Sequence, residues 1–173
     1  MKTVLFGTCL FVSCVWPLGL VVSAAESTTT LTANDPVQKE VALITKAHHA
    51  ARTDDDDTAD AQIGTAGDLH VAPSVLLARR AMTVCGWLQN DNEYGRANKV
   101  AQRALKRLAD MKENNDKDRE ERLYWEAALE GRILDHKRVA IKLLATAEKL
   151  IPNDTRVLDL ERELTPAVAQ FGH

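Results

Sequence analysis

Residues that form tight turns are scarce in this chain. It contains 8 glycines and 5 prolines among 173 residues. A turn-rich β-sandwich would need more of both to connect its strands. The length is enough to bury one ordinary core and too short for two. We therefore expect a single domain and do not expect a β-sandwich.

Cysteine and net positive charge are also lacking. Cys9 and Cys14 lie in an apolar N-terminal run, which leaves Cys85 as the one cysteine of the remaining chain. A lone cysteine forms no internal disulfide, so the stability of the fold has to come from packing. The net charge is −3, which removes the electrostatic footprint of a nucleic-acid-binding protein. We predict no nucleic-acid partner.

Motifs for catalysis or cofactor binding are absent from the sequence. There is no Gly-x-Ser-x-Gly, no Walker-type phosphate loop, no dinucleotide-binding fingerprint and no pair of CxxC motifs. His48 and His49 are adjacent, so on a helix they point about 100° apart and cannot share a metal ion. Cys85 falls on a core-facing position, where we expect a small packing residue. The sequence predicts no enzyme, no cofactor and no metal site.

The N-terminus resembles an export signal. Lys2 is followed by an uncharged, mostly apolar run over residues 4–22, and small residues follow at Ala24 and Ala25. This order is typical of a signal peptide. We predict that residues 1–25 are removed and that the protein is exported, to the periplasm or as a secreted protein. The alternative is an uncleaved membrane anchor, because about 19 apolar residues can just span a bilayer.

Three segments with different compositions follow. Residues 26–34 are rich in Ser and Thr and predict a flexible leader. Asp35 can cap a helix and Pro36 suits its first position, so we expect an amphipathic helix over 35–52. Residues 53–73 contain four adjacent aspartates and two glycines. The aspartates lack the alternate spacing of a calcium loop, so we predict a solvated, disordered acidic linker.

Residues 74–165 have apolar positions at steps of three and four almost throughout, which is the pattern of amphipathic helices. Ser74 is the expected N-cap of the first helix, and residues 166–173 form a tail. The expected helices cover 75–90, 94–111, 123–134, 137–151 and 155–164. We expect the charged stretch at 112–122 to be a solvated helical extension with a break at Asn114 and Asn115. The predicted fold is all-α, built from antiparallel helix pairs.

The two helix pairs match each other at a period of 43 residues, by residue size at helical spacing. Matched positions include Ala81 with Tyr124, Cys85 with Ala128, Ala97 with Ala140, Ala101 with Leu144 and Leu108 with Ile151. The later pair resembles the tetratricopeptide repeat (TPR) family over Tyr124, Ala128, Ala140, Leu144, Ala147 and the exit at Pro152. Small residues let paired helices approach closely, so we expect contacts of Cys85 with Ala97 and of Ala128 with Ala140. The period differs from the 34 residues of the family.

The resemblance implies a TPR-like α-solenoid fragment over about 75–165, with a C-terminal capping helix at 155–164. A plain bundle of about five helices is the alternative. In the family, the first helix of each repeat lines a ligand groove. By position, the candidate ligand contacts are Arg79, Met82, Gln89, Arg122, Trp125, Arg132 and Arg156. This face is basic with an aromatic anchor, Trp125, and would suit a protein or peptide partner with an acidic group or a free C-terminus.

A second basic surface follows from the spacing of Arg96, Lys99, Arg103 and Lys106, which lie opposite the apolar stripe of their helix. It is either a solvated helix face or a contact for anionic lipid headgroups. We expect a protein-interaction module or assembly adaptor of the cell envelope. The alternative is a self-associating structural component, a homodimer that buries the apolar surface left over by a short repeat array.

Overall fold

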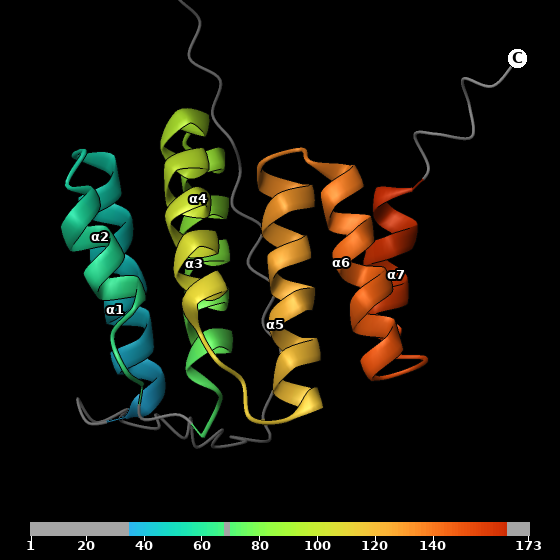
Figure 1. Cartoon of the computed structure of the whole chain (residues 1–173). Coiled ribbons are helices and arrows are strands. Elements are labelled where there is room, and N and C mark those ends of the chain that lie inside the picture. The colour runs from blue at the N-terminus through green and yellow to red at the C-terminus, as the bar shows by residue number, and fades with distance from the viewer. Residues whose placement is uncertain (1–34, 68–69, 166–173) are drawn as a thin grey trace, which may run out of the picture. The chain divides into compact units, whose positions relative to one another are not determined.

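The computed structural model describes residues 35–67 and 70–165. The predicted signal peptide, leader and tail lie outside the described residues. The described part is helical and contains no strands, which confirms the all-α prediction. Its elements are α1 (Pro36–Arg52), α2 (Asp56–Ile63), α3 (Pro73–Asn90), α4 (Tyr94–Asp110), α5 (Asp116–Ala128), the π-helical segment η1 (Leu129–Ile133), α6 (Lys137–Leu150) and α7 (Thr155–Leu164) (Figure 1).

Consecutive helices pack as antiparallel hairpins. The closest neighbours are α1 with α2, α3 with α4, and α5 with α6, and α7 then packs on α6 (Figure 1). The turns contain four residues with positive φ in the described part, Asp54, Asn92, Asp135 and Asn153. Asp and Asn tolerate this left-handed conformation better than other residues with a side chain. The chain therefore reverses direction at these turns without glycine at the left-handed position.

Two helices with a capping aspartate in the sequence begin where the sequence predicts. Asp35 Oδ1 accepts a hydrogen bond from the Val37 amide at 3.0 Å and begins α1. Asp154 caps α7 in the same way, through the Arg156 amide at 2.8 Å. The predicted cap at Ser74 is wrong. Helix α3 begins two residues earlier than expected, at Pro73, because proline needs no amide partner in the first turn.

The prediction of a helix-free linker over 53–73 is also wrong. Within it, Asp56–Ile63 forms α2, and Asp55 caps this helix by accepting from the Thr58 amide at 3.1 Å. Acidic side chains in a first turn are stabilised by the helix dipole. The repulsion between the aspartates is further reduced by cations of α4, described below.

The charged stretch before α5 is divided between a connection and a helix. Asn115 accepts from the Asp118 amide at 2.8 Å, so α5 begins at Asp116 rather than at residue 123. The helical extension and the break at Asn115 are thus as predicted, and this first part of α5 is mostly exposed except at Glu120.

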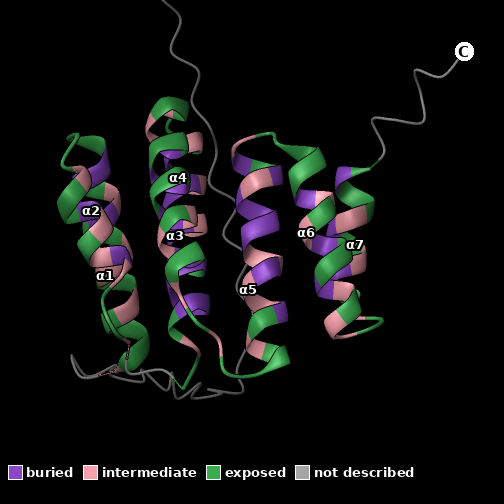
Figure 2. Cartoon of the chain, viewed as in Figure 1, coloured by how far each residue is buried: buried purple, intermediate pink, exposed green. Residues whose placement is uncertain are grey.

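Buried residues form two hydrophobic clusters, concentrated where helices face their neighbours (Figure 2). The first cluster joins α1 to α4 with η1, and the second joins α5 to α7. Met82 and Trp125 are half-buried and pack against both clusters, so they connect the two.

Small residues do allow close approach inside the hairpins. The Cys85 thiol donates to the Ala97 carbonyl at 3.3 Å, which confirms the predicted contact. Ala128 and Ala140 are both fully buried in the second cluster. A Cβ on Gly131 would lie 2.6 Å from Leu164 Cδ1 and 3.2 Å from Ala140 Cβ. The absence of a side chain at Gly131 therefore lets α6 and α7 pack against η1.

Candidate interaction face

The seven predicted contact residues lie on α3, α5, η1 and α7. Arg79 is exposed on α3 and makes no ion pair among the described residues. Met82 lies one turn further along α3, half-buried at the junction with α5. Gln89 lies nearly three helical turns beyond Arg79. The structure thus places Arg79 and Met82 near α5, and Gln89 away from them.

Trp125 is more firmly packed than a free ligand anchor. It is half-buried between the two clusters, and its ring lies edge-on to Tyr124 with centroids 5.3 Å apart. Its indole nitrogen donates to Glu121 Oε1 at 3.4 Å. Trp125 therefore joins the two clusters. Because part of its surface remains accessible, it also borders the candidate interaction face.

Arg156 is the centre of a polar network between α5 and α7. Its guanidinium donates to Glu121 Oε1 at 2.8 Å and to Asp154 Oδ2 at 2.9 Å, and lies 3.5 Å from a Glu120 oxygen. It also lies 5.4 Å from the centre of the Tyr124 ring, in cation–π range. The hydrogen bonds from Arg156 lower the pKa of Asp154. This arginine is therefore fully engaged within the protein.

Arg132 and Arg122 are also paired with carboxylates of the protein. Arg132 forms a two-point ion pair with Glu163 at 2.9 and 2.5 Å, which lowers the pKa of that carboxyl. Arg122 pairs with Glu126 at 2.5 Å, although burial raises the pKa of Glu126 above its usual value. The two ends of α7 are thus tied to α5 and η1 by arginines that we expected to face a ligand.

A cavity of about 320 Å³ lies where the start of α3 meets the start of α5. It is lined by His70, Val71, Ala72, Val75, Arg79, Lys117, Asp118 and Glu121. Sequence reasoning found only Arg79 among these residues. The spacing of Lys117, Glu121 and Trp125 at steps of four could have indicated that they share one side of α5.

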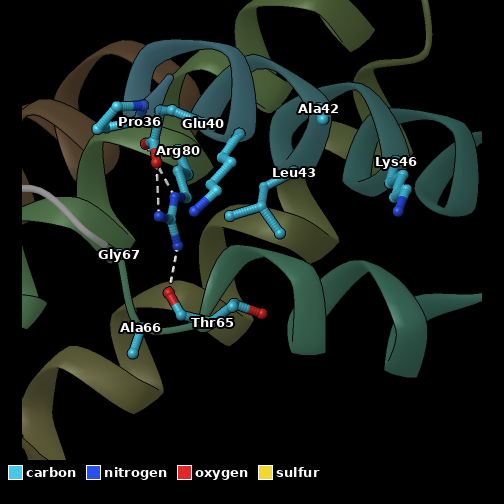
Figure 3. Close-up of a pocket in the computed structure, with 10 residues that line it drawn as sticks. Pro36, Glu40, Ala42, Leu43, Lys46, Thr65, Ala66, Gly67 and Arg80 are labelled. Carbon is cyan, nitrogen blue, oxygen red and sulfur yellow. Dashed lines mark hydrogen bonds and ion pairs between the residues drawn. The ribbon is translucent and has the colours of Figure 1, made fainter. Parts of the chain in front are cut away.

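A second cavity, of about 300 Å³, lies between α1, the segment after α2, and α3 (Figure 3). Its floor contains Arg80, whose side chain is 0% exposed. The Arg80 guanidinium donates to both Glu40 oxygens, at 2.9 and 2.5 Å, to the Ile63 carbonyl at 3.2 Å and to the Thr65 carbonyl. These bonds attach α1, the end of α2 and the segment that follows it to α3, which is the structural role of Arg80. Sequence reasoning missed it, although it is a cation in an otherwise apolar helix start.

The basic face of α4 is exposed to solvent, as one of the two interpretations predicts, and is partly neutralised by carboxylates. Arg96 and Lys99 both pair with Asp54, and Arg103 pairs with Asp56 and Asp57. Lys106 is exposed and has no ion pair among the described residues.

Three further features of the described part concern the Cys85 thiol, potential metal ligands and the apolarity of the helices. Burial raises the pKa of the Cys85 thiol to about 12, which disfavours the reactive thiolate. Within 35–67 and 70–165, no three potential metal ligands of the His, Cys, Asp or Glu type gather at one point. No helix in these ranges combines the length and apolarity needed to cross a bilayer.

No protein-family model matches the sequence, and comparisons with curated proteins and with solved structures find no match.

Proposed function

We propose that the protein is an exported, TPR-like interaction module of the cell envelope that binds a protein or peptide partner beside α3 and α5. The observation that carries this proposal is the cavity at the start of these helices. Arg79 stands at its edge as a cation without an ion pair in the described part of the chain, next to the apolar side chains of Val71 and Val75. Concave sites that combine apolar walls with a few placed polar groups are typical of ligand binding.

The order of the helices supports the TPR-like part of the proposal. The hairpins α1–α2, α3–α4 and α5–α6 follow one another, and α7 stands at the end. The first helix of each hairpin contacts the first helix of the next, α1 with α3 and α3 with α5, and α5 in turn contacts α7. Repeat arrays usually need three units to bury a continuous core. The α1–α2 hairpin supplies a unit that the sequence alone did not reveal.

The charges on this face narrow the chemistry of the partner. Because Arg122, Arg132 and Arg156 are paired with carboxylates of the protein, Arg79 is the predicted arginine left to bind a carboxylate of the ligand, and Lys117 is a second cation on the cavity wall. The cavity walls fit an aliphatic side chain beside it. We therefore propose a partner segment with one carboxylate next to an aliphatic residue, rather than a long acidic stretch.

Site-specific crosslinking tests this proposal. A photoreactive amino acid at Lys117, on the cavity wall, should capture a partner in the native envelope fraction. Arg79→Glu should abolish that crosslink, since it places a negative charge where the ligand carboxylate binds. Arg138→Glu is the matched control, because Arg138 is an exposed arginine on α6 without an ion pair among the described residues. Equal crosslinking in both variants would contradict the proposal.

Self-association is the alternative function, and a different observation favours it. Val37 and Val41 are one turn apart on α1 and are 60% and 53% exposed. An apolar pair of this kind at the first hairpin could meet a second copy of the chain. Sedimentation equilibrium distinguishes the two functions, since a homodimer would become a monomer in Val37→Asp/Val41→Asp, whereas an adaptor would be monomeric throughout.

The mass of the intact protein tests whether the predicted signal peptide is removed on export. The intact protein from soluble envelope extract should begin at Ala25 or Glu26 if the signal peptide is removed. A product retained in washed membranes with its first residues intact would instead support an anchor.

A further inference from the structure

Two charged features that are distant in the sequence meet in the structure. One is the acidic run at the α1–α2 turn and the start of α2, and the other is the basic face of α4, formed by Arg96, Lys99, Arg103 and Lys106. Arg96 Nη2 lies 2.9 Å from Asp54 Oδ2, and Lys99 Nζ lies 3.6 Å from Asp54 Oδ1. Arg103 Nη1 lies 2.9 Å from Asp57 Oδ1.

We propose that the basic face of α4 is a docking surface for anionic lipid headgroups, and that Asp54 and Asp57 are internal counter-ions that keep its affinity low. In this arrangement a headgroup phosphate or carboxylate replaces the aspartates at the guanidinium and ammonium groups. The proposal concerns a different surface from the cavity between α3 and α5.

The ion pairs are placed where an external anion can compete with them. Asp57 has a side chain that is 96% exposed, and that of Asp54 is 56% exposed. Exposed ion pairs contribute little to stability and exchange partners readily. The aspartates can therefore turn away without unfolding α2, which is still attached through buried Ala59 and Ile63.

The basic face keeps its geometry when the aspartates leave. On its opposite side, α4 packs through small and apolar residues, which are Ala97, Ala101, Ala104 and Leu108, all buried in the first cluster. The cations from Arg96 to Lys106 follow one side of a straight helix over about 15 Å. A row of several cations at this spacing can contact several headgroups at once.

The shape of the surface favours lipid over a peptide. The recess between α2 and α4, beside Arg103, measures only about 10 Å³. A recess of this size has room for about one water molecule and cannot hold a peptide side chain. Multiple cations without a specificity pocket are typical of attraction to an anionic membrane surface.

The test measures binding of the purified chain to lipid vesicles. In Asp54→Asn/Asp57→Asn two counter-ions are removed, whereas Glu93 stays 2.7 Å from Arg96 and Asp56 stays 3.6 Å from Arg103. The fold is kept, because Asp54 has φ 58° and asparagine accepts this conformation. The matched control is Glu113→Gln/Glu161→Gln, which changes the net charge equally at two carboxylates that form no ion pair with α4 among the described residues. Each is compared on phosphatidylcholine vesicles and on vesicles that also contain phosphatidylserine.

We expect Asp54→Asn/Asp57→Asn to bind the phosphatidylserine vesicles about five- to twenty-five-fold more tightly than the unmodified chain does. Lys99 loses its ion pair, Arg96 and Arg103 each lose one of two, and a freed cation contributes roughly five-fold. Added Arg103→Glu should reverse much of the gain, and the gain should disappear at high salt. Asp57→Asn alone should give part of it. This single variant keeps the test valid if the double variant is poorly folded by circular dichroism.

Three results would overturn the proposal. An equal gain in the Glu113→Gln/Glu161→Gln control would mean that net charge alone is responsible. An equal gain on pure phosphatidylcholine would mean that binding is apolar. Binding of polyglutamate by the aspartate variant, without binding of the anionic vesicles, would assign the surface to an acidic peptide instead.

Discussion

The buried charged residues of this protein differ in whether hydrogen bonds offset the free-energy cost of removing them from water. Arg80 is fully buried and uses its guanidinium in bonds to Glu40 and to two carbonyls. Glu120 is 1% exposed, and neither of its carboxylate oxygens has a hydrogen-bond donor. Its nearest cation in the described part is Arg156, at 3.5 Å. A buried carboxylate without donors opposes folding, so Glu120 is a weak point of α5.

Neutralising Glu120 should therefore stabilise the protein. Burial is the main cause of the raised pKa of Glu120, and the nearby charge of Asp154 adds to it. Because the folded-state pKa exceeds the unfolded value of about 4.5, the ionised carboxylate lowers stability above the folded pKa, and this penalty disappears as the pH falls. We expect Glu120→Gln to raise Tm at pH 7 by about 2–4 °C, as a gain near 1 kcal/mol would. Calorimetry at pH 7 and pH 5 measures both effects.

The neighbouring Glu121 provides the control for this prediction. Its carboxylate accepts from Arg156 and Trp125, so Glu121→Gln should lower Tm. A rise in both variants, or a fall in Glu120→Gln, would contradict the argument from burial.

Cys85 should react only when the protein opens. Its side chain is fully buried against Ala97, and its thiol pKa is raised to about 12. At pH 8 a thiol reagent should label the native protein many-fold more slowly than the urea-unfolded chain. Ala145→Cys on the exposed side of α6 is the positive control and should be labelled at once. Immediate labelling of native Cys85 would mean that the α3–α4 contact opens readily.

At the scale of elements, α2 depends most on charges. It has eight residues, too few for a stable isolated helix, and it buries Ala59 and Ile63. The carboxylate of Asp55 caps it, and the aspartates paired with α4 in its first turn and the preceding turn add to this. We therefore expect α2 to be the described helix that responds most strongly to acid and to salt.

The acid response has a defined direction. The hydrogen bond from Arg96 is the main cause of the lowered pKa of Asp54, and that from Thr58 of the lowered pKa of Asp55. Because the folded-state pKa values lie below about 3.8, the stabilisation is complete above that pH and is lost as the pH falls through the folded values. NMR titration from pH 6 to pH 2 should show Asp54 titrating below 3.8, and the α2 amide shifts should be lost only when Asp55, the cap of α2, is protonated as well. A midpoint above 3.8 for Asp54 would contradict the pairing with Arg96.

The contrast between α1 and α2 explains how much the sequence could predict. The start of α1 depends on Asp35 and Pro36, which are adjacent, so a local pattern was sufficient. The aspartates of α2 repel one another locally, and the partners that neutralise them lie more than 40 residues further along the chain. The same limit applies to the candidate face. Spacing placed Arg132 and Arg156 correctly on their helices, but the carboxylates that pair with them belong mostly to other helices.

At the scale of the whole described part, two hydrophobic clusters depend on a narrow connection. Met82 and Trp125 are the half-buried residues that pack against both. The first cluster holds the α1–α2 and α3–α4 hairpins, and the second holds α5, α6 and α7. Cooperative unfolding of the two clusters therefore requires good packing at this junction.

Truncation of the tryptophan tests this connection. We expect Trp125→Ala to destabilise the protein by about 2–3 kcal/mol, less than a fully buried tryptophan would, and to broaden urea unfolding into two steps. Trp87→Ala is the control, because Trp87 is 37% exposed and packs mainly against His48. It should cost less than about 1 kcal/mol. Unchanged stability in Trp125→Ala would instead favour a direct role of Trp125 in ligand contact.

The hairpin turns have a consequence for the speed of folding. The left-handed turn residues Asp54, Asn92 and Asp135 each join two helices that are adjacent in the chain. Contacts are consequently local in sequence, and helical proteins of this kind fold within microseconds to milliseconds. In the export that we propose, a polypeptide that crosses a membrane unfolded would regain its hairpins soon after it emerges. It would do so without waiting for a disulfide, because Cys85 is the one cysteine outside the predicted signal peptide.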